Sequence, residues 1–357
     1  MDMLTKYVVI SFGCLGRGRP VPRALISRLS SPVQALKHMT MVTATFHAAM
    51  SSSASSGATL NSLLEPEELV GAGGLGTPSS PFKFLDGSWH MNKARNGRSE
   101  FDCERLPGAQ FFDIDRISDT SSGLPHMLPT ESQFGDAMTE LGISNEDHIV
   151  VYTTAQCFSA SRTWWTLRAF GHQKVSILNG GLEAWKRAGG KTDTDTTTGP
   201  THPIRASPPY VAKLDARMVV DWREVLSIVE SGSAQIADAR SLARFLAEAP
   251  EPRDGLVGGH IPGSLSLPFT NLVKEDDPTT FRSKEQVRDA LVDSGIVLGS
   301  RVVLSCGSGV TACVIAFGLD LIGKDLASAP VYDGSWSEWG DAKLSQQRGL
   351  PIVGKKK

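Results

Sequence analysis

The stretch RVVLSCGSGVTACVIAFGLDLIG, residues 301–323, decides the fold that this sequence predicts. It starts with a short apolar run over 301–305, passes Cys306 and a loop of small residues, and continues with apolar residues at helical spacing up to Gly323. This pattern indicates a buried strand, a tight loop and a helix. Such a unit is typical of a mainly parallel α/β sheet that helices cover on both faces.

The same landmarks occur twice in the chain and in the same order. Asp86 in FLDGSW corresponds to Asp238 in IADARS, and LNGGLEAW corresponds to YDGSWSEW. LPGA at 106–109 corresponds to IPGS at 261–264, and the paired landmarks lie 152 to 155 positions apart. A constant order at nearly constant spacing predicts two tandem copies of one α/β domain.

The polar, proline-containing segment DTDTTTGPTHPIRASPP, residues 193–209, has no hydrophobic periodicity and indicates a linker between the copies. We therefore expect an N-terminal domain over 60–192 and a C-terminal domain over 210–348.

The first 58 residues differ from the rest in composition. They contain six Lys or Arg residues, one acidic residue and many Ser and Ala residues. Residues 1–58 are therefore expected to be a transit peptide that directs the protein to mitochondria, with an untargeted disordered tail as the alternative. An internal start at Met39, Met41 or Met50 would give an additional cytoplasmic form.

The composition excludes several classes of protein. With 40% hydrophobic residues, 21% charged residues and a net charge of −2, the chain resembles a soluble globular protein and has no basic field for nucleic acid. No apolar run approaches the ~20 residues that span a bilayer. The five cysteines show no CxxC pair and no zinc-ligand spacing, so we expect neither a metal nor a cofactor.

Cys306 follows a predicted strand and precedes a predicted helix, which is where α/β sheets bind ligands. The small residues Gly307, Ser308 and Gly309 let the loop curl so that successive amides converge. Converging amides and the helix dipole stabilise an anion, which favours a nucleophilic thiolate at Cys306. A buried cysteine beside a turn, without chemistry, is the alternative.

Two other cysteines are expected to be inactive. Cys313 falls inside the apolar helix and is expected to belong to the core. In the first copy, VVYTTAQCFSASRTWW aligns Thr154 with Cys306, while Cys157 lacks flanking glycines. The first copy is therefore predicted to be catalytically silent and to form one wall of the site.

Four motifs resemble the two-domain rhodanese family: EPRDG at 251–255, GHIPGS at 259–264, CGSGVTAC at 306–313 and YDGSWSEW at 332–339. The resemblance covers about residues 60–345 and implies two rhodanese domains. It also implies transfer of a sulfane sulfur through a cysteine persulfide, with loop amides, from Gly307, Gly309, Val310 and Thr311, around the sulfur.

The residues after Cys306 favour one type of donor. Thiosulfate sulfurtransferases of the family have basic side chains there, whereas Gly307 and Ser308 are uncharged, as in the 3-mercaptopyruvate sulfurtransferases. Without local cations the loop would hold a second negative charge poorly. The resemblance further implies that Arg244 and Arg253 hold the donor's carboxylate and carbonyl, which suits the planar fork of arginine. Arg240 is expected to be structural.

The resemblance also implies a proton relay in which Asp115 and His126 act with the loop serine, Ser308. An interface hydrogen-bond network is the alternative for these three residues. Together, these features predict transfer of sulfur from 3-mercaptopyruvate to a thiol or cyanide, with release of pyruvate. A thiol acceptor such as thioredoxin or a small dithiol would go on to release hydrogen sulfide.

Three other functions stay open at this point. They are a thiosulfate:cyanide sulfurtransferase, a non-catalytic rhodanese-like binding module, and a Cys-x5-Arg phosphatase. The phosphatase would need an arginine six residues after the cysteine, where this chain has Ala312.

Overall fold

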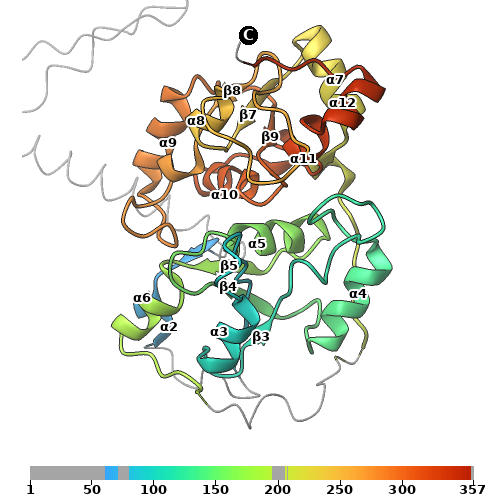
Figure 1. Cartoon of the computed structure of the whole chain (residues 1–357). Helices are drawn as coiled ribbons and strands as arrows, with labels where there is room; N and C mark the ends of the chain where they lie inside the picture. Colours follow the sequence, from blue (N-terminus) through green and yellow to red (C-terminus); the bar gives the residue numbers. More distant parts are fainter. Residues whose placement is uncertain (1–60, 71–79, 195–205, 207, 355–357) are drawn as a thin grey trace, which may run out of the picture. The chain divides into compact units, whose positions relative to one another are not determined.

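The computed structural model describes residues 61–70, 80–194, 206 and 208–354. These residues form two five-stranded sheets, with strand orders β1-β5-β4-β2-β3 and β6-β10-β9-β7-β8 (Figure 1). All of the strand pairings are parallel. Adding five to each strand number of the first sheet gives the order of the second. The predicted duplication of a mainly parallel α/β domain is therefore confirmed.

The first copy extends from β1 to α6. Its strands are β1 (Leu63–Leu64), β2 (Phe82–Asp86), β3 (Gln110–Phe111), β4 (His148–Tyr152) and β5 (Val175–Leu178). Its helices are α2 (Pro66–Val70), α3 (Gly97–Cys103), α4 (Glu131–Glu140), α5 (Ala160–Ala169) and α6 (Gly181–Arg187).

The second copy extends from η1 to α12. Its strands are β6 (Val219–Val220), β7 (Gln235–Asp238), β8 (Leu265–Ser266), β9 (Val302–Ser305) and β10 (Val331–Tyr332). Its α-helices are α7 (Trp222–Ser231), α8 (Leu242–Phe245), α9 (Lys284–Asp293), α10 (Ala312–Leu321), α11 (Ser335–Trp339) and α12 (Ala342–Arg348). Short 3-10 helices are η1 (Ala216–Met218), η2 (Phe269–Asn271) and η3 (Leu326–Ser328).

Local sequence explains where several elements begin and end. Helix α9 starts with a capping box, in which Ser283 and Gln286 each bind the other's backbone amide. Helix α10, in contrast, follows Thr311, whose side chain makes no capping hydrogen bond. Pro268, two residues after β8, lies at an edge position that needs no amide donor, because Leu267 and Phe269 on either side of it donate to the carbonyls of Asp238 and Ala239.

Helices α5 and α10 pack against each other between the two sheets (Figure 1). The rings of Trp164 and Phe317 meet edge-to-face with centroids 4.8 Å apart, and one hydrophobic cluster contains buried residues of both copies. Helix α10 follows the cysteine loop of the second copy, and α5 follows the equivalent loop of the first. The packing therefore brings the two loop regions close to the boundary between the copies.

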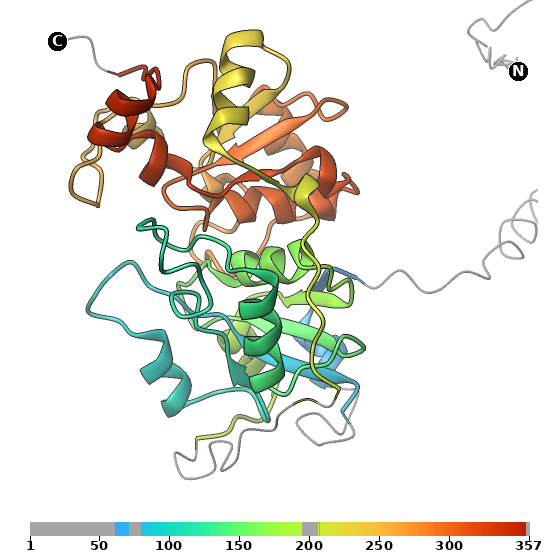
Figure 2. The same ribbon diagram turned by 90° about the vertical axis from the view of Figure 1, so that its right-hand side faces the viewer.

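The chain crosses from one copy to the other after residue 208, and Figure 2 shows this yellow segment running along the first copy up to η1. The predicted transit peptide at 1–58 and most of the predicted linker lie outside the described residues. Among the helices of the described ranges, none has the length and apolar character that a membrane crossing requires.

Candidate active site

Cys306 follows directly after the last residue of β9, at the carboxyl end of the second sheet. Its carbonyl accepts a hydrogen bond from the amide of Trp336 (3.0 Å), and the carbonyl of Gly307 accepts from the amide of Ser337 (2.8 Å). Both donors come from α11. The carbonyl oxygens at the start of the loop are thus held on the side of α11.

The loop amides are the donors left over by this arrangement. Within the described part of the chain, the N–H groups of residues 307–311 have no hydrogen-bond acceptor. Because C=O and the following N–H point in opposite directions in a trans peptide, a Gly307 carbonyl held by α11 turns the Ser308 amide to the opposite side. Such a group of free amides at an uncapped helix start is suited to an anion.

The thiol itself is enclosed. Cys306 is only 2% exposed and belongs to a hydrophobic cluster, and its own amide donates to Ser335 Oγ (3.2 Å) rather than to the loop interior. Cations flank the next residue. A Cβ atom on Gly307 would lie 3.3 Å from Arg244 Nη2 and 3.8 Å from Arg253 Nη1. The glycine therefore lets two guanidinium groups approach the cysteine loop.

Arg244 comes from α8 and is held from behind by an acidic side chain. Its Nη2 lies 2.5 Å from Glu251 Oε2, and the other oxygen of Glu251 accepts from Arg240 Nη1 (2.9 Å). The side chain of Arg244 stays 19% exposed, whereas that of Arg240 is fully buried.

Arg240 also pairs with Asp238 (2.6 Å) and donates to the Gly259 carbonyl (2.7 Å). Its contacts are all internal, as expected for a structural residue.

Arg253 connects the loop to the first copy. Its Nη2 donates to Ser308 Oγ (3.2 Å) and lies 3.5 Å from His126 Nε2. Burial lowers the pKa of Arg253, and neighbouring Arg244 lowers it further, while the charge of Cys306 acts in the opposite direction. Two guanidinium groups in one half-buried place are chemically suited to an anion.

His126 and Asp115 approach the loop from the segment between β3 and α4. His126 is buried, and its Nδ1 lies 2.9 Å from Asp115 Oδ1. Burial lowers the pKa of His126 although Asp115 opposes this, so the imidazole is neutral at pH 7. Among the described residues, no hydrogen bond joins His126 to Ser308, and Arg253 Nη2 lies near both.

The remaining predicted site residues lie at the helix start. Val310 is buried, and Thr311 precedes α10 without making a side-chain cap. Cys313 is buried inside α10 and donates from Sγ to the Gly309 carbonyl (3.1 Å), and burial raises the pKa of its thiol. Cys313 therefore lies in the core, as the sequence predicts.

One sequence alignment is wrong by a residue. Strand pairing places Asp86 opposite Tyr152 and Asp238 opposite Ser305, so the residue after the strand is Thr153 in one copy and Cys306 in the other. The carbonyls of Thr153 and Cys306 also accept equivalent bonds, from Leu182 and Trp336. Thr153, not Thr154, corresponds to the cysteine, because the first-copy loop has one more residue before its helix.

Arg162 was missed by the sequence argument. This arginine of α5 is 2% exposed and donates to the carbonyl of Gly309 in the cysteine loop (3.2 Å). A signal was present in SASRTWW, where a charged residue stands in a helix segment that is otherwise apolar or small, immediately after the first-copy loop. Such a residue is buried only when something pairs with it.

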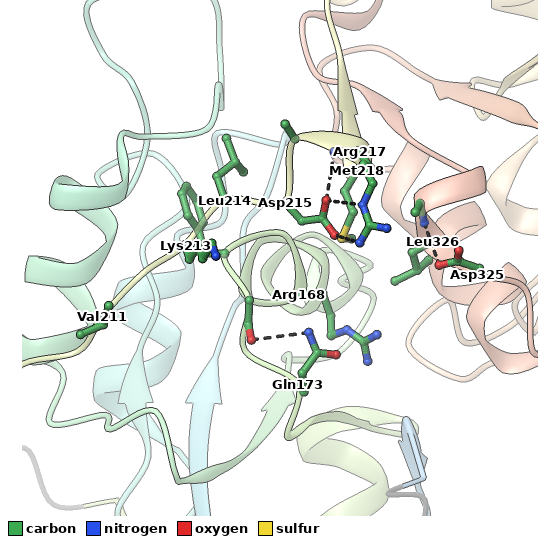
Figure 3. A pocket seen from close by; sticks show the side chains of 14 residues that line it. Arg168, Gln173, Val211, Lys213, Leu214, Asp215, Arg217, Met218, Asp325 and Leu326 are labelled. Carbon is green, nitrogen blue, oxygen red and sulfur yellow. Dashed lines mark hydrogen bonds and ion pairs between the residues drawn. The ribbon is translucent and has the colours of Figure 1, made fainter.

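A cavity of about 630 Å³ lies beside the segment that follows the predicted linker, and Figure 3 shows its lining. Arg168, Lys213 and Asp325 are among the residues around it. None of the predicted site residues lines it. Nor do the described residues contain a group of three or more His, Cys, Asp or Glu side chains placed to hold a metal ion.

Comparison with protein families places this architecture. The rhodanese-like domain matches the chain twice, at residues 94–188 and 221–342. The chain belongs to the rhodanese family. Its fold, two tandem rhodanese domains, is therefore the one that the sequence predicts.

Individual relatives agree with this assignment. A 3-mercaptopyruvate sulfurtransferase of Mus musculus is 40% identical over 264 residues, which are 73% of this chain and 86% of the relative. The thiosulfate/3-mercaptopyruvate sulfurtransferase 1, mitochondrial, of Arabidopsis thaliana is 39% identical over 76% of this chain and 73% of its own length. The crystal structure of SseA from Escherichia coli, a 3-mercaptopyruvate sulfotransferase, matches 78% of this chain and 100% of its own with 35% identity and a TM-score of 0.67.

Proposed function

We propose that this rhodanese is a 3-mercaptopyruvate sulfurtransferase in which Cys306 carries the sulfur. The observation that supports it most is the surroundings of Gly307, where two guanidinium groups flank a loop of unpaired amides that has no basic side chain of its own. Mercaptopyruvate has one carboxylate and one carbonyl for Arg244 and Arg253, and one sulfur for the cysteine.

In the first half-reaction, the Cys306 thiolate attacks the sulfur of the donor. An S–S bond forms and the donor's C–S bond breaks, so that its electron pair remains on carbon as the enolate of pyruvate. Protonation of that carbon gives pyruvate. The outer sulfur of the persulfide is stabilised by the loop amides, which act as preorganised donors.

The proton relay is part of the same proposal. Ser308 supplies a hydroxyl of the cysteine loop itself, and Arg253 donates to it. The Nε2 atom of His126 lies near the same guanidinium, and its Nδ1 atom lies near Asp115. A donor carboxylate that binds Arg253 would draw this guanidinium away from Ser308 and His126. That movement is needed before His126 and Ser308 can exchange a proton directly.

In the second half-reaction, a thiolate acceptor attacks the outer sulfur and Cys306 leaves as thiolate. With a dithiol such as reduced thioredoxin, the second thiol then displaces hydrosulfide and a disulfide forms, which gives hydrogen sulfide. Cyanide would take the same sulfur as thiocyanate.

A single-turnover assay tests the donor half-reaction. Without an acceptor, about one pyruvate per chain should be released from 3-mercaptopyruvate in a burst, and Cys306→Ser should release none. Cys103→Ser, which changes an exposed cysteine outside the site, is the matched control and should keep the burst. A wild-type chain without a burst would leave the non-catalytic binding module as the better interpretation.

Thiosulfate is the competing donor. A loop without basic side chains should hold its second negative charge less well, so kcat/KM should favour 3-mercaptopyruvate. A ratio in favour of thiosulfate would contradict the donor assignment and leave the sulfur-carrier role intact.

Mitochondrial targeting by residues 1–58 is proposed from their composition and from the mitochondrial name of the Arabidopsis relative. Fusions of a fluorescent protein to residues 1–58, and to the chain starting at Met50, would test it. The first should enter mitochondria and the second should stay in the cytoplasm.

A further inference from the structure

Arg162 is a charged residue in an unusual place. It belongs to α5 of the copy that lacks the catalytic cysteine, yet its guanidinium is buried at the contact with the other copy. Its Cζ lies 4.9 Å from the centre of the Trp165 ring. A buried guanidinium is retained only where its donors have partners.

The partners of Arg162 are three separate segments around the site. Nη1 donates to Asp333 Oδ1 (2.7 Å) and to the Gly309 carbonyl (3.2 Å), and Nη2 donates to the carbonyl of His126. The second oxygen of Asp333 accepts from the amide of Leu128 (2.7 Å). One planar fork therefore joins the cysteine loop, the turn after β10 and the segment that carries His126.

The contact with Gly309 determines how the loop is shaped. Gly309 has a φ of +76°, and a Cβ atom there would lie 2.7 Å from Arg162 Nη1, so only glycine permits this approach. The carbonyl of Gly309 accepts from Arg162 Nη1 and also from Cys313 Sγ (3.1 Å). Held in this way, the peptide turns the Val310 amide in the opposite direction. Arg162, together with Cys313, thus orients one of the amides that have no other partner among the described residues.

The contact with His126 has a similar effect. His126 has a φ of +62°, a left-handed conformation that is costly for a residue with a Cβ atom. The hydrogen bond from Arg162 holds its carbonyl, while Asp115 and Arg253 lie against the two ring nitrogens. The orientation of the imidazole therefore depends on Arg162 as well as on its own neighbours.

We propose that Arg162 is a positioning residue for sulfur transfer, which aligns the loop amides and His126 with Cys306 without touching the donor. This inference rests on the proposed function. It also gives the silent copy a definite role, because the catalytic loop takes its shape from a side chain of that copy.

The main test compares Arg162→Lys with wild type and with Arg168→Lys. Arg168 lies two turns further along α5, and its contact is with the Trp164 ring rather than with the loop. Lysine keeps the charge at position 162 but cannot bond Gly309, Asp333 and His126 at once. The expected result is a ~100-fold lower kcat with a KM for 3-mercaptopyruvate within about threefold of wild type, since small displacements of reacting groups act on kcat.

A purely structural role predicts a different result. In that case Arg162→Lys would unfold at lower temperature, but its folded fraction would have the kcat of wild type, and the inference would be overturned. Arg168→Lys should have wild-type kcat and KM. If wild type itself showed no pyruvate burst, the proposed function would fail before Arg162 is tested.

Gly309→Ala is a second variant in case Arg162→Lys does not fold. It keeps Arg162 and Asp333 but places a Cβ atom against Nη1, so the guanidinium must leave the loop carbonyl. We expect a similar loss of kcat and slower single-turnover pyruvate release. Addition of millimolar guanidinium to Arg162→Ala should restore part of the burst, and wild-type kcat in Gly309→Ala would contradict the proposal.

Discussion

The two copies share one fold but differ in the charged groups beside one loop, which follows β4 in the first copy and β9 in the second. In the second copy, Glu251 lies behind Arg240 and Arg244, and the space beside the cysteine loop is bordered by cations. In the first copy, the carboxylate of Glu100 lies in the corresponding region. It accepts from Thr154 Oγ1 (2.6 Å) and Arg95 Nε (2.7 Å).

Glu100 acts as an internal anion for the first copy. His90 Nε2 also lies 3.0 Å from it. Burial alone would raise the pKa of Glu100, but hydrogen bonds from Arg95, Thr154 and His90 outweigh burial and bring the pKa to about 2. The first copy thus differs by more than Thr153 in the place of Cys306, because a carboxylate of the chain already lies beside its loop.

The two copies also differ around the aspartate that ends β2 in the first copy and β7 in the second. Asp238 is paired with Arg240, whereas the equivalent Asp86 has Ser88 two residues later and its Oδ2 has no hydrogen-bond partner among the described residues. Burial is the main cause that raises the pKa of Asp86 to about 7. The carboxyl of Asp238 is paired with a guanidinium, whereas burial of Asp86 without such a partner favours its protonated form.

The largest expected effect comes from changing the residues that directly follow β4 and β9, which are Thr153 and Cys306. Cys306→Ser should reduce turnover to background, because the hydroxyl cannot form a persulfide. Adding Thr153→Cys to that variant should not restore activity, since the first copy has Glu100 where the donor's carboxylate would need to bind. Turnover of 3-mercaptopyruvate measures both variants, and activity in the double variant would show that the copies are chemically equivalent.

Arginines beside the two loops should differ next. Arg244→Ala should raise the KM for 3-mercaptopyruvate about 10- to 100-fold, since a charge-assisted hydrogen bond contributes about 1.5–3 kcal/mol. Glu251 would keep Arg240 as its partner. Arg95→Ala, the matched change in the first copy, should leave KM unchanged. Steady-state kinetics decide between these outcomes, and an unaltered KM for Arg244→Ala would remove this residue from the carboxylate site.

Replacement of the aspartate that ends β2 and of the one that ends β7 should have opposite effects on stability. Folded Asp86 has a pKa of about 7 against an ordinary value of 3.8, so wild type loses stability as pH rises between these values. Asp86→Asn removes this loss. The free energy of unfolding of Asp86→Asn relative to that of wild type should therefore increase from pH 4 to pH 7, by a few kcal/mol at most, and then level off.

Asp238→Asn is the control for that experiment. It removes a charge partner from buried Arg240 and should destabilise the protein by about 3–5 kcal/mol at every pH tested. Urea unfolding at several pH values measures both variants. A pH-independent effect of Asp86→Asn would contradict the proton at Asp86.

The sequence was sufficient for the features that depend on local order. The strand, loop and helix around Cys306 and the internal role of Arg240 follow from motifs that lie within a few residues of each other. The duplication follows from the repetition of such motifs in the same order, 152 to 155 positions apart. The lengths of the two loops were harder to compare. Thr154 was aligned with Cys306 because a one-residue difference is hidden in sequence, whereas strand pairing at Asp86 and Tyr152 reveals it.

The remaining features arise from contacts between distant segments. Arg162 meets Gly309 only because α5 packs on α10, and Glu100 meets Thr154 only after α3 has folded under the loop. The sequence marks Arg162 only as a charged residue in an apolar helix segment, and neither contact can be read from a motif or a period. Composition could identify these residues as charged, but it could not say which group they would neutralise.

Peptide mapping of the sulfur after one turnover tests the central claim most directly. The protein would be treated with 3-mercaptopyruvate without an acceptor, and its thiols and persulfides would be alkylated. The mass of each cysteine-containing peptide would then be measured by mass spectrometry. We predict one additional sulfur atom on Cys306, located by fragmentation of its peptide because Cys313 lies on the same tryptic peptide, and none on Cys313, Cys103 or Cys157. Sulfur on any of those three, or on no cysteine, would contradict the account.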